Sequence, residues 1–217
     1  MKKSASAVSI IGGADGPTSV FLLKRNSKLK LKHRLKRFKH KIRRAHIEKT
    51  LKSESHTIDE VMEYIVNTHG FIELDKNSDE VIEEYNEIRA SFIMQYAPEL
   101  LEEYAVMPQL KSESQEAVHA HFEQIQKRMQ KALEIPVTEF DIDFHKYKKS
   151  LDDKNDNMHI VIEKNYAYIG GGVSGDKKIV KRYQHIYKDV YRYYGVTTED
   201  IRIKSKRYKE VVRTLSQ

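Results

Sequence analysis

The chain has 217 residues, of which a third are charged and 39% are hydrophobic, so it can form one medium-sized domain or two small ones with a modest core. It has no cysteine, which excludes disulfides, thiolate metal sites and cysteine nucleophiles. The net charge of +7 is unevenly distributed: residues 24–49 contain 13 lysines and arginines and one acid, Glu48, residues 50–156 are net acidic and residues 157–217 are net basic. This layout indicates either pairing between segments or a basic arm for an anionic partner.

Residues 1–23 form an apolar leader that is interrupted by three glycines and a proline. Its length matches a membrane span, but its apolar residues contribute only about −0.5 kcal/mol each, whereas Asp15 costs about +3 kcal/mol at a helix centre. It also lacks the continuous apolar run and clear cleavage site of a signal peptide. We therefore expect that the leader does not span a membrane alone and that the chain is cytoplasmic, with peripheral attachment at the inner face of the membrane as the finer expectation.

The next segment, residues 24–52, predicts a basic amphipathic helix. Its apolar residues recur at helical spacings of four and three, and the positions around them are mostly Lys, Arg or His. The stripe consists of Leu31, Leu35, Phe38, Ile42 and Ala45.

More helices are predicted in the acidic segment that follows. Thr57 and Glu60 form a capping box, and Gly70 is suited to end the helix that the box begins. Residues 78–96 predict a second helix, Pro98 opens a short one, and residues 113–134 predict a third long helix.

The periodicity then changes to that of strands. Residues 137–144 alternate apolar and polar side chains, which predicts a strand, and residues 149–157 predict an exposed loop. Residues 158–172 predict two short strands joined as a hairpin around Lys164 and Asn165. Residues 176–194 predict a helix that Gly195 closes, and Thr197 or Thr198 caps a last helix to about residue 215.

These elements predict an α+β fold that is predominantly helical, in which a helical half is followed by a small antiparallel hairpin or sheet with two C-terminal helices. The expected organisation is a leader (1–23), a basic helix (24–52), an acidic helical region (53–135) and an α+β region (136–217). The last two regions either share one core or form separate cores.

Residues 9–22, SIIGGADGPTSVFL, closely resemble a signature of the β subunit of the sodium-ion-translocating decarboxylase pumps. In that family the segment is a broken, re-entrant membrane element whose aspartate lies on the sodium path. The resemblance implies that Asp15 is a sodium ligand, and Gly12, Gly13, Gly16, Pro17 and Thr18 match the surrounding break. Backbone carbonyls freed by such a break suit sodium. The match covers 14 of 217 residues and no further hydrophobic spans follow, so it implies a β-subunit-like protein or fragment that retains only the sodium-site motif.

The basic helix predicts contact with anionic lipid or with nucleic-acid phosphate. Lys and Arg near an anionic surface contribute about 1 kcal/mol each, and the apolar stripe can enter the membrane interface. The same cations would neutralise nucleic-acid phosphates, although no recognised nucleic-acid-binding motif accompanies them. A third alternative is that the helix lies on acidic helices of this or another chain. The candidate contacts are Lys30, Lys32, Arg34, Lys36, Arg37, Lys39, Lys41, Arg43 and Arg44.

Two further patterns occur in the basic C-terminal segment. Gly170, Gly172 and Gly175, followed by Lys177, predict a flexible turn or a weak anion site. The tyrosines at positions 183, 187, 191 and 194 share one helical face, which favours packing against a sheet and leaves base stacking as the alternative.

The sequence contains no nucleophile elbow, P-loop or paired acid/base motif, and its histidines and aspartates lack metal-ligand spacing. We therefore expect a non-enzymatic interaction protein, with no catalytic residue and no cofactor, that associates with an anionic membrane surface or a membrane protein through its basic arm. Nucleic-acid binding through the arm and the C-terminal helices is the first alternative. The sodium role implied by the resemblance is the second.

Overall fold

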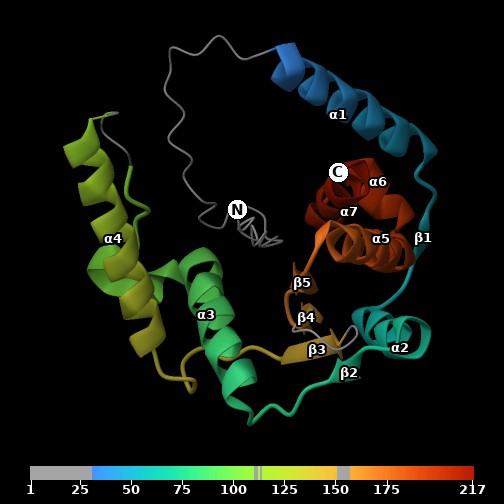
Figure 1. Ribbon diagram of the computed structural model, residues 1–217. Helices are drawn as coiled ribbons and strands as arrows, with labels where there is room; N and C mark the ends of the chain where they lie inside the picture. Colours follow the sequence, from blue (N-terminus) through green and yellow to red (C-terminus); the bar gives the residue numbers. More distant parts are fainter. Residues whose placement is uncertain (1–30, 110–111, 113, 151–156) are drawn as a thin grey trace, which may run out of the picture. The chain divides into compact units, whose positions relative to one another are not determined.

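The computed structural model describes residues 31–109, 112, 114–150 and 157–217 (Figure 1). The leader with Asp15 and the candidate contact Lys30 lie outside these residues. The described part confirms the predicted class, because it is predominantly helical with a small antiparallel sheet and C-terminal helices.

The chain forms two compact units that are interleaved in sequence. Of the described residues, the first comprises 31–73, 147–150, 157–162 and 167–217, and the second comprises 74–109, 112, 114–146 and 163–166. The boundary expected at residue 136 therefore does not separate the units. The reason is a long-range strand pairing, in which Ile72 and Glu73 lie opposite Lys148 and Tyr147 and bring residues 53–73 into the unit of the C-terminal half.

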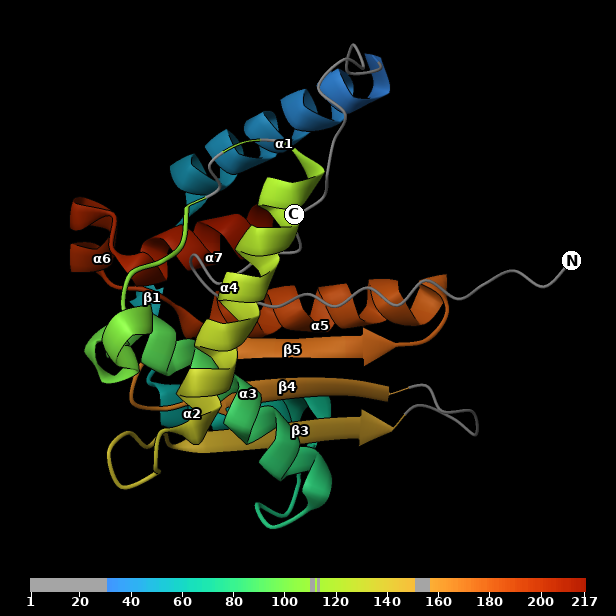
Figure 2. The ribbon, with the colours of Figure 1, turned by 90° about the vertical axis from the view of Figure 1, so that its left-hand side faces the viewer.

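The sheet has the strand order β2-β3-β4-β5. Its strands are β2 (Ile72–Glu73), β3 (Phe144–Ser150), β4 (Asn157–Glu163) and β5 (Tyr168–Ser174), and the last three run side by side in Figure 2. The first unit also holds α1 (Leu31–Thr50), β1 (Glu54–Ser55), α2 (Ile58–His69), α5 (Lys177–Tyr194), β6 (Gly195–Val196), α6 (Thr198–Ile203) and α7 (Lys206–Ser216). Here α5 runs along β5, α7 packs on α5, and α1 packs on α7 (Figure 2).

One hydrophobic core holds the first unit together. Alternate residues of β4, namely Met158, Ile160 and Ile162, are fully buried and meet the inner faces of α2, α5 and α7. Local signals in the sequence position these helices: the predicted capping box of Thr57 and Glu60 begins α2, and Gly70 and Gly195 cap the ends of α2 and α5.

The second unit is built from α3 (Asp79–Tyr96), the 3₁₀ helix η1 (Pro98–Tyr104) and α4 (Gln115–Glu134). Ala90, Leu101 and Ala132 are among the side chains of its small core. Lys146 is also buried in this unit, and its ammonium lies 2.9 Å from Glu80 and 2.7 Å from Glu84 of α3.

Two predicted elements differ from the structure. Of the strand expected over 137–144, residues 137–143 do not form a strand, because the carbonyl of Pro136 accepts from the amides of Glu139 and Phe140 and makes a turn. The strand begins at Phe144 and runs through Ser150, where a loop was expected. The single helix expected to about residue 215 is broken between α6 and α7, because Lys204 adopts a left-handed conformation and Ser205 caps a new helix.

Gly195 lies where β6 approaches β1, and we predict that Gly195→Ala costs more than about 3 kcal/mol of folding free energy. Its φ of 59° and ψ of −158° suit glycine alone, and an added Cβ would lie 1.8 Å from the carbonyl oxygen of Glu54. Urea denaturation measures the change.

Gly70→Ala is the matched control. Gly70 also has a positive φ, of 65°, but an added Cβ would meet only the flexible end of Lys149 at 3.6 Å. We expect a cost of about 1–2 kcal/mol, the ordinary cost of a left-handed alanine. Equal losses at the two positions would mean that the close approach of β1 to β6 contributes nothing.

Candidate functional site

The basic helix predicted from the sequence is α1, and its cations face solvent. The backbone of Lys32 lies in α1, but its side chain is outside the described set. The seven remaining candidate contacts are all exposed: Arg34, Lys36, Arg37, Lys39, Lys41, Arg43 and Arg44.

The apolar stripe of α1 is exposed as well at its four described side chains, since that of Leu31 is outside the described set. Leu35, Phe38 and Ile42 are 53%, 61% and 54% exposed and fall within about 60° of one another around the helix. Ile47 projects roughly 150° away from them, and it packs on the core of the first unit, to which α7 contributes Tyr208. The helix is therefore attached by one face and presents its apolar stripe on nearly the opposite face.

Cations border the stripe on both sides. By helix geometry, Lys39 lies beside one edge of the stripe, and Arg34 and Lys41 lie beside the other. Around the helix axis, each of the three is within roughly 100° of the centre of the stripe. Long basic side chains in such positions can lay their carbon stems along an apolar surface while their charged ends reach outward. Such an arrangement is typical of amphipathic helices that bind membrane interfaces.

The basic surface continues from α1 onto α5. Burial, and then the charges of Arg43 and Arg192, lowers the pKa of the Lys188 ammonium on α5. Arg43 also donates to the main-chain oxygen of Gln217 at 3.2 Å, and Gln217 and Lys188 line the same small hollow. Asp189 lies 3.9 Å from Arg192, but within the part of the chain that is described no carboxylate pairs with Lys188. An anion near Lys188 would therefore reduce its repulsion with Arg43 and Arg192.

The glycine-rich segment has a different role from the one predicted. Gly170 and Gly172 lie inside strand β5 and are not part of a turn. The start of α5 is capped by Asp176, whose carboxylate accepts from the amides of Lys178 and Ile179. A carboxylate already occupies the amides that would bind an anion, so the geometry of Gly175 and Lys177 lends no support to an anion site.

The tyrosine face of α5 is buried, which confirms packing over base stacking. Tyr183, Tyr187, Tyr191 and Tyr194 all belong to the core of the first unit, and the hydroxyls of Tyr187 and Tyr191 donate to the carbonyl of Ile169 at 3.0 and 2.9 Å.

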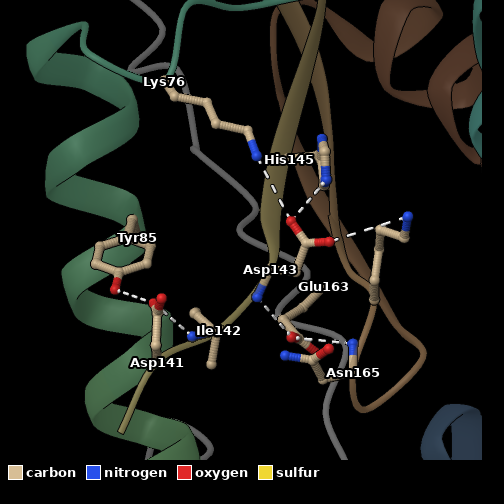
Figure 3. Close-up of polar contacts among 9 residues, drawn as sticks. Lys76, Tyr85, Asp141, Ile142, Asp143, His145, Glu163 and Asn165 are labelled. Carbon is tan, nitrogen blue, oxygen red and sulfur yellow. Dashed lines mark hydrogen bonds and ion pairs between the residues drawn. The ribbon is translucent and has the colours of Figure 1, made fainter. Parts of the chain in front are cut away.

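A polar network in the second unit was not predicted from the sequence (Figure 3). The Asp143 carboxylate accepts from Lys76 at 3.5 Å and faces His145 at 3.0 Å and Lys164 at 3.9 Å. Beside it, the buried Glu163 accepts from three backbone amides, those of Asp143, Asn165 and Tyr166.

This network has a structural function. Burial raises the pKa of the Glu163 carboxyl despite the three amide donors. Because both oxygens of the Glu163 carboxylate accept hydrogen bonds from backbone amides, this side chain fixes the turn at 164–167 and the start of β3.

A second group that sequence reasoning missed lies between α2 and α5. The Tyr193 ring is stacked between His56 and Tyr64, with ring centroids 3.7 and 4.0 Å away. The Tyr64 hydroxyl donates to Asp189 at 2.7 Å, and His69 Nε2 lies 3.3 Å from the same carboxylate. These residues are up to 137 positions apart, so no local spacing could have revealed them.

The described residues contain no group of three or more His, Asp or Glu side chains placed to hold a metal ion. Among the helices of this part of the chain, none combines the length and apolar composition that crossing a membrane requires. No protein-family model, curated protein or solved structure matches the chain.

We predict that His69 makes the stability of the protein fall with acidification. Burial lowers the pKa of His69 in spite of Asp189, and Lys149 acts in the same direction as burial. The unfolded chain therefore binds a proton more readily, and stability is lost as the pH falls below the ordinary histidine pKa of about 6.5.

The measurement compares urea denaturation of the wild type and His69→Phe at several pH values between 7.5 and 5. In this window the unfolding free energy of the variant should depend less steeply on pH than that of the wild type, by up to the contribution of about one bound proton. His119→Phe, at an exposed position on α4, is the control for replacing a histidine by phenylalanine. Parallel curves for the wild type and His69→Phe would contradict the prediction.

Proposed function

We propose that this protein is a non-enzymatic interaction protein that binds the surface of an anionic membrane peripherally through α1. The observation that carries the proposal is the exposed stripe of Leu35, Phe38 and Ile42, which is bordered by cations and directed away from the face that packs on α7. In this orientation the stripe can enter the headgroup region while the first unit stays folded outside it.

The expected affinity follows from charge and apolar area. Four cations near an anionic surface contribute about 1 kcal/mol each. Burying the exposed halves of three large apolar side chains adds about 1 kcal/mol each. The sum of about 7 kcal/mol corresponds to a dissociation constant on the order of 10 µM. Binding of this strength is reversible and suits peripheral association.

Lipid explains the site better than nucleic acid does. A phosphate backbone would neutralise the cations but would leave Leu35, Phe38 and Ile42 in water, because it offers no apolar interior. The tyrosines of α5, for which base stacking was the alternative, are buried in the core. The mutual repulsion of Arg43, Lys188 and Arg192 favours any anion, so it supports an anionic headgroup without distinguishing it from nucleic acid.

The absence of tryptophan from the chain allows a direct test. A Phe38→Trp variant should show a blue-shifted emission with vesicles of phosphatidylcholine and phosphatidylglycerol, and brominated acyl chains should quench it, because the indole enters the interface. Ile203→Trp, at a 57% exposed position on α6, is the control and should show neither effect.

Sedimentation with the same vesicles provides the affinity. The triple variant Leu35→Ser, Phe38→Ser, Ile42→Ser should bind about a hundredfold more weakly, since it loses about 3 kcal/mol of apolar burial. Unchanged emission of Phe38→Trp on vesicles, together with a strongly salt-dependent gel shift on duplex DNA, would overturn membrane binding and favour the nucleic-acid alternative.

A further inference from the structure

The second unit contains an open hollow of about 650 Å³ beside α3. This volume lies in the range of small-molecule sites. One wall comes from α3 and the other from the segment that leads into β3. Six of the eleven lining side chains are apolar or aromatic: Val81, Ile82, Tyr85, Val137, Ile142 and Phe144. The polar ones include one cation, Lys76, which is paired with Asp143.

Asp141 stands on the rim of this hollow and is held in place by neutral donors. Its Oδ1 accepts from the Tyr85 hydroxyl and from the amide of Ile142, both at 2.7 Å (Figure 3). Within the described residues no Lys, Arg or His lies within ion-pair distance of Asp141, and its Oδ2 has no hydrogen-bond donor. The carboxylate is therefore fixed in position, and its charge is not balanced.

The neighbouring Asp143 is different, although it lines the same hollow. Lys76, His145 and Lys164 surround its carboxylate at 3.5, 3.0 and 3.9 Å. The negative charge available to a ligand on this rim is thus that of Asp141.

We propose that this hollow binds a small organic cation, a primary ammonium on an aromatic or branched aliphatic body, with the ammonium on Oδ2 of Asp141. The apolar walls would bury the body, and the Tyr85 ring beside the carboxylate adds a cation–π partner. An anionic ligand would face Asp141, and a neutral one would leave its charge without a partner, so the site selects for positive charge.

The properties of Tyr85 support this assignment. Burial, followed by the hydrogen bond to Asp141, raises the pKa of Tyr85 to about 12. The phenol therefore keeps its proton at neutral pH and continues to orient the carboxylate. The site is part of the second unit and does not depend on membrane binding by α1.

The test uses three probes that share a phenethyl body and differ in charge: phenethylamine, 2-phenylethanol and phenylacetate. Titrations of the full chain are followed by amide chemical-shift changes in two-dimensional NMR. We expect the amine to cause saturable shifts around Tyr85 and Ile142 at millimolar concentration. The affinity of the alcohol should be lower by about tenfold or more, and phenylacetate should not bind.

Asp141→Asn separates the charge from the fold, since the amide oxygen can still accept from Tyr85 and Ile142. It should weaken the amine about tenfold and leave the alcohol unchanged. Glu83→Gln, an exposed acid on α3 outside the hollow, is the control and should bind like the wild type. Equal binding of amine and alcohol, an unchanged affinity in Asp141→Asn, or no shift with any probe would each overturn the proposal.

Discussion

The first unit depends on the close packing of the tyrosine face of α5 against strand β5. Tyr187 and Tyr191 are buried and satisfy their hydroxyls on the carbonyl of Ile169. Such contact requires the strand to lack side chains at the point of approach: a Cβ on Gly171 would lie 2.6 Å from the Tyr183 hydroxyl and 2.3 Å from the carbonyl of His159. The glycine run, which in the sequence predicts a flexible turn or a weak anion site, is thus explained at Gly171 by packing, because this glycine makes room for the Tyr183 ring.

This packing also determines what α1 can do. The strands, α2, α5 and α7 form the core, and α1 reaches it chiefly through Ile47 at the C-terminal end of the helix. The face that carries Leu35, Phe38 and Ile42 has no place in that core and stays exposed. The proposed membrane binding rests on this exposed stripe, because a partner that covers it and its flanking cations would have to be both apolar and anionic. A membrane surface meets both requirements.

The sequence predicts those elements whose causes are local. The capping box of Thr57 and Glu60 and the stops at Gly70 and Gly195 depend on residues within a turn of one another, and the structure confirms them. The strand expected at 137–144 fails because an alternating pattern cannot show that Pro136 starts a turn. The interleaving of the two units depends on the pairing of β2 with β3 across more than 70 residues, which no local pattern encodes. The apolar stripe of α1 and the cations beside it are visible in the sequence, but the direction in which the stripe faces follows only from the packing of Ile47 on the core.

The same limit explains why the carboxylate on the rim of the hollow could not be identified from the sequence. Asp141 and Asp143 are two positions apart in a single acidic, alternating stretch, and by composition they are equivalent. Their difference comes from distant partners: Lys76 reaches Asp143 from the start of the unit, whereas α3 offers Asp141 only the Tyr85 hydroxyl. A cation balances the charge of one carboxylate, and a neutral hydroxyl fixes the other without balancing it. A residue's capacity to bind a ligand therefore depends on which of its charges the fold has left unbalanced, and tertiary contacts alone decide this.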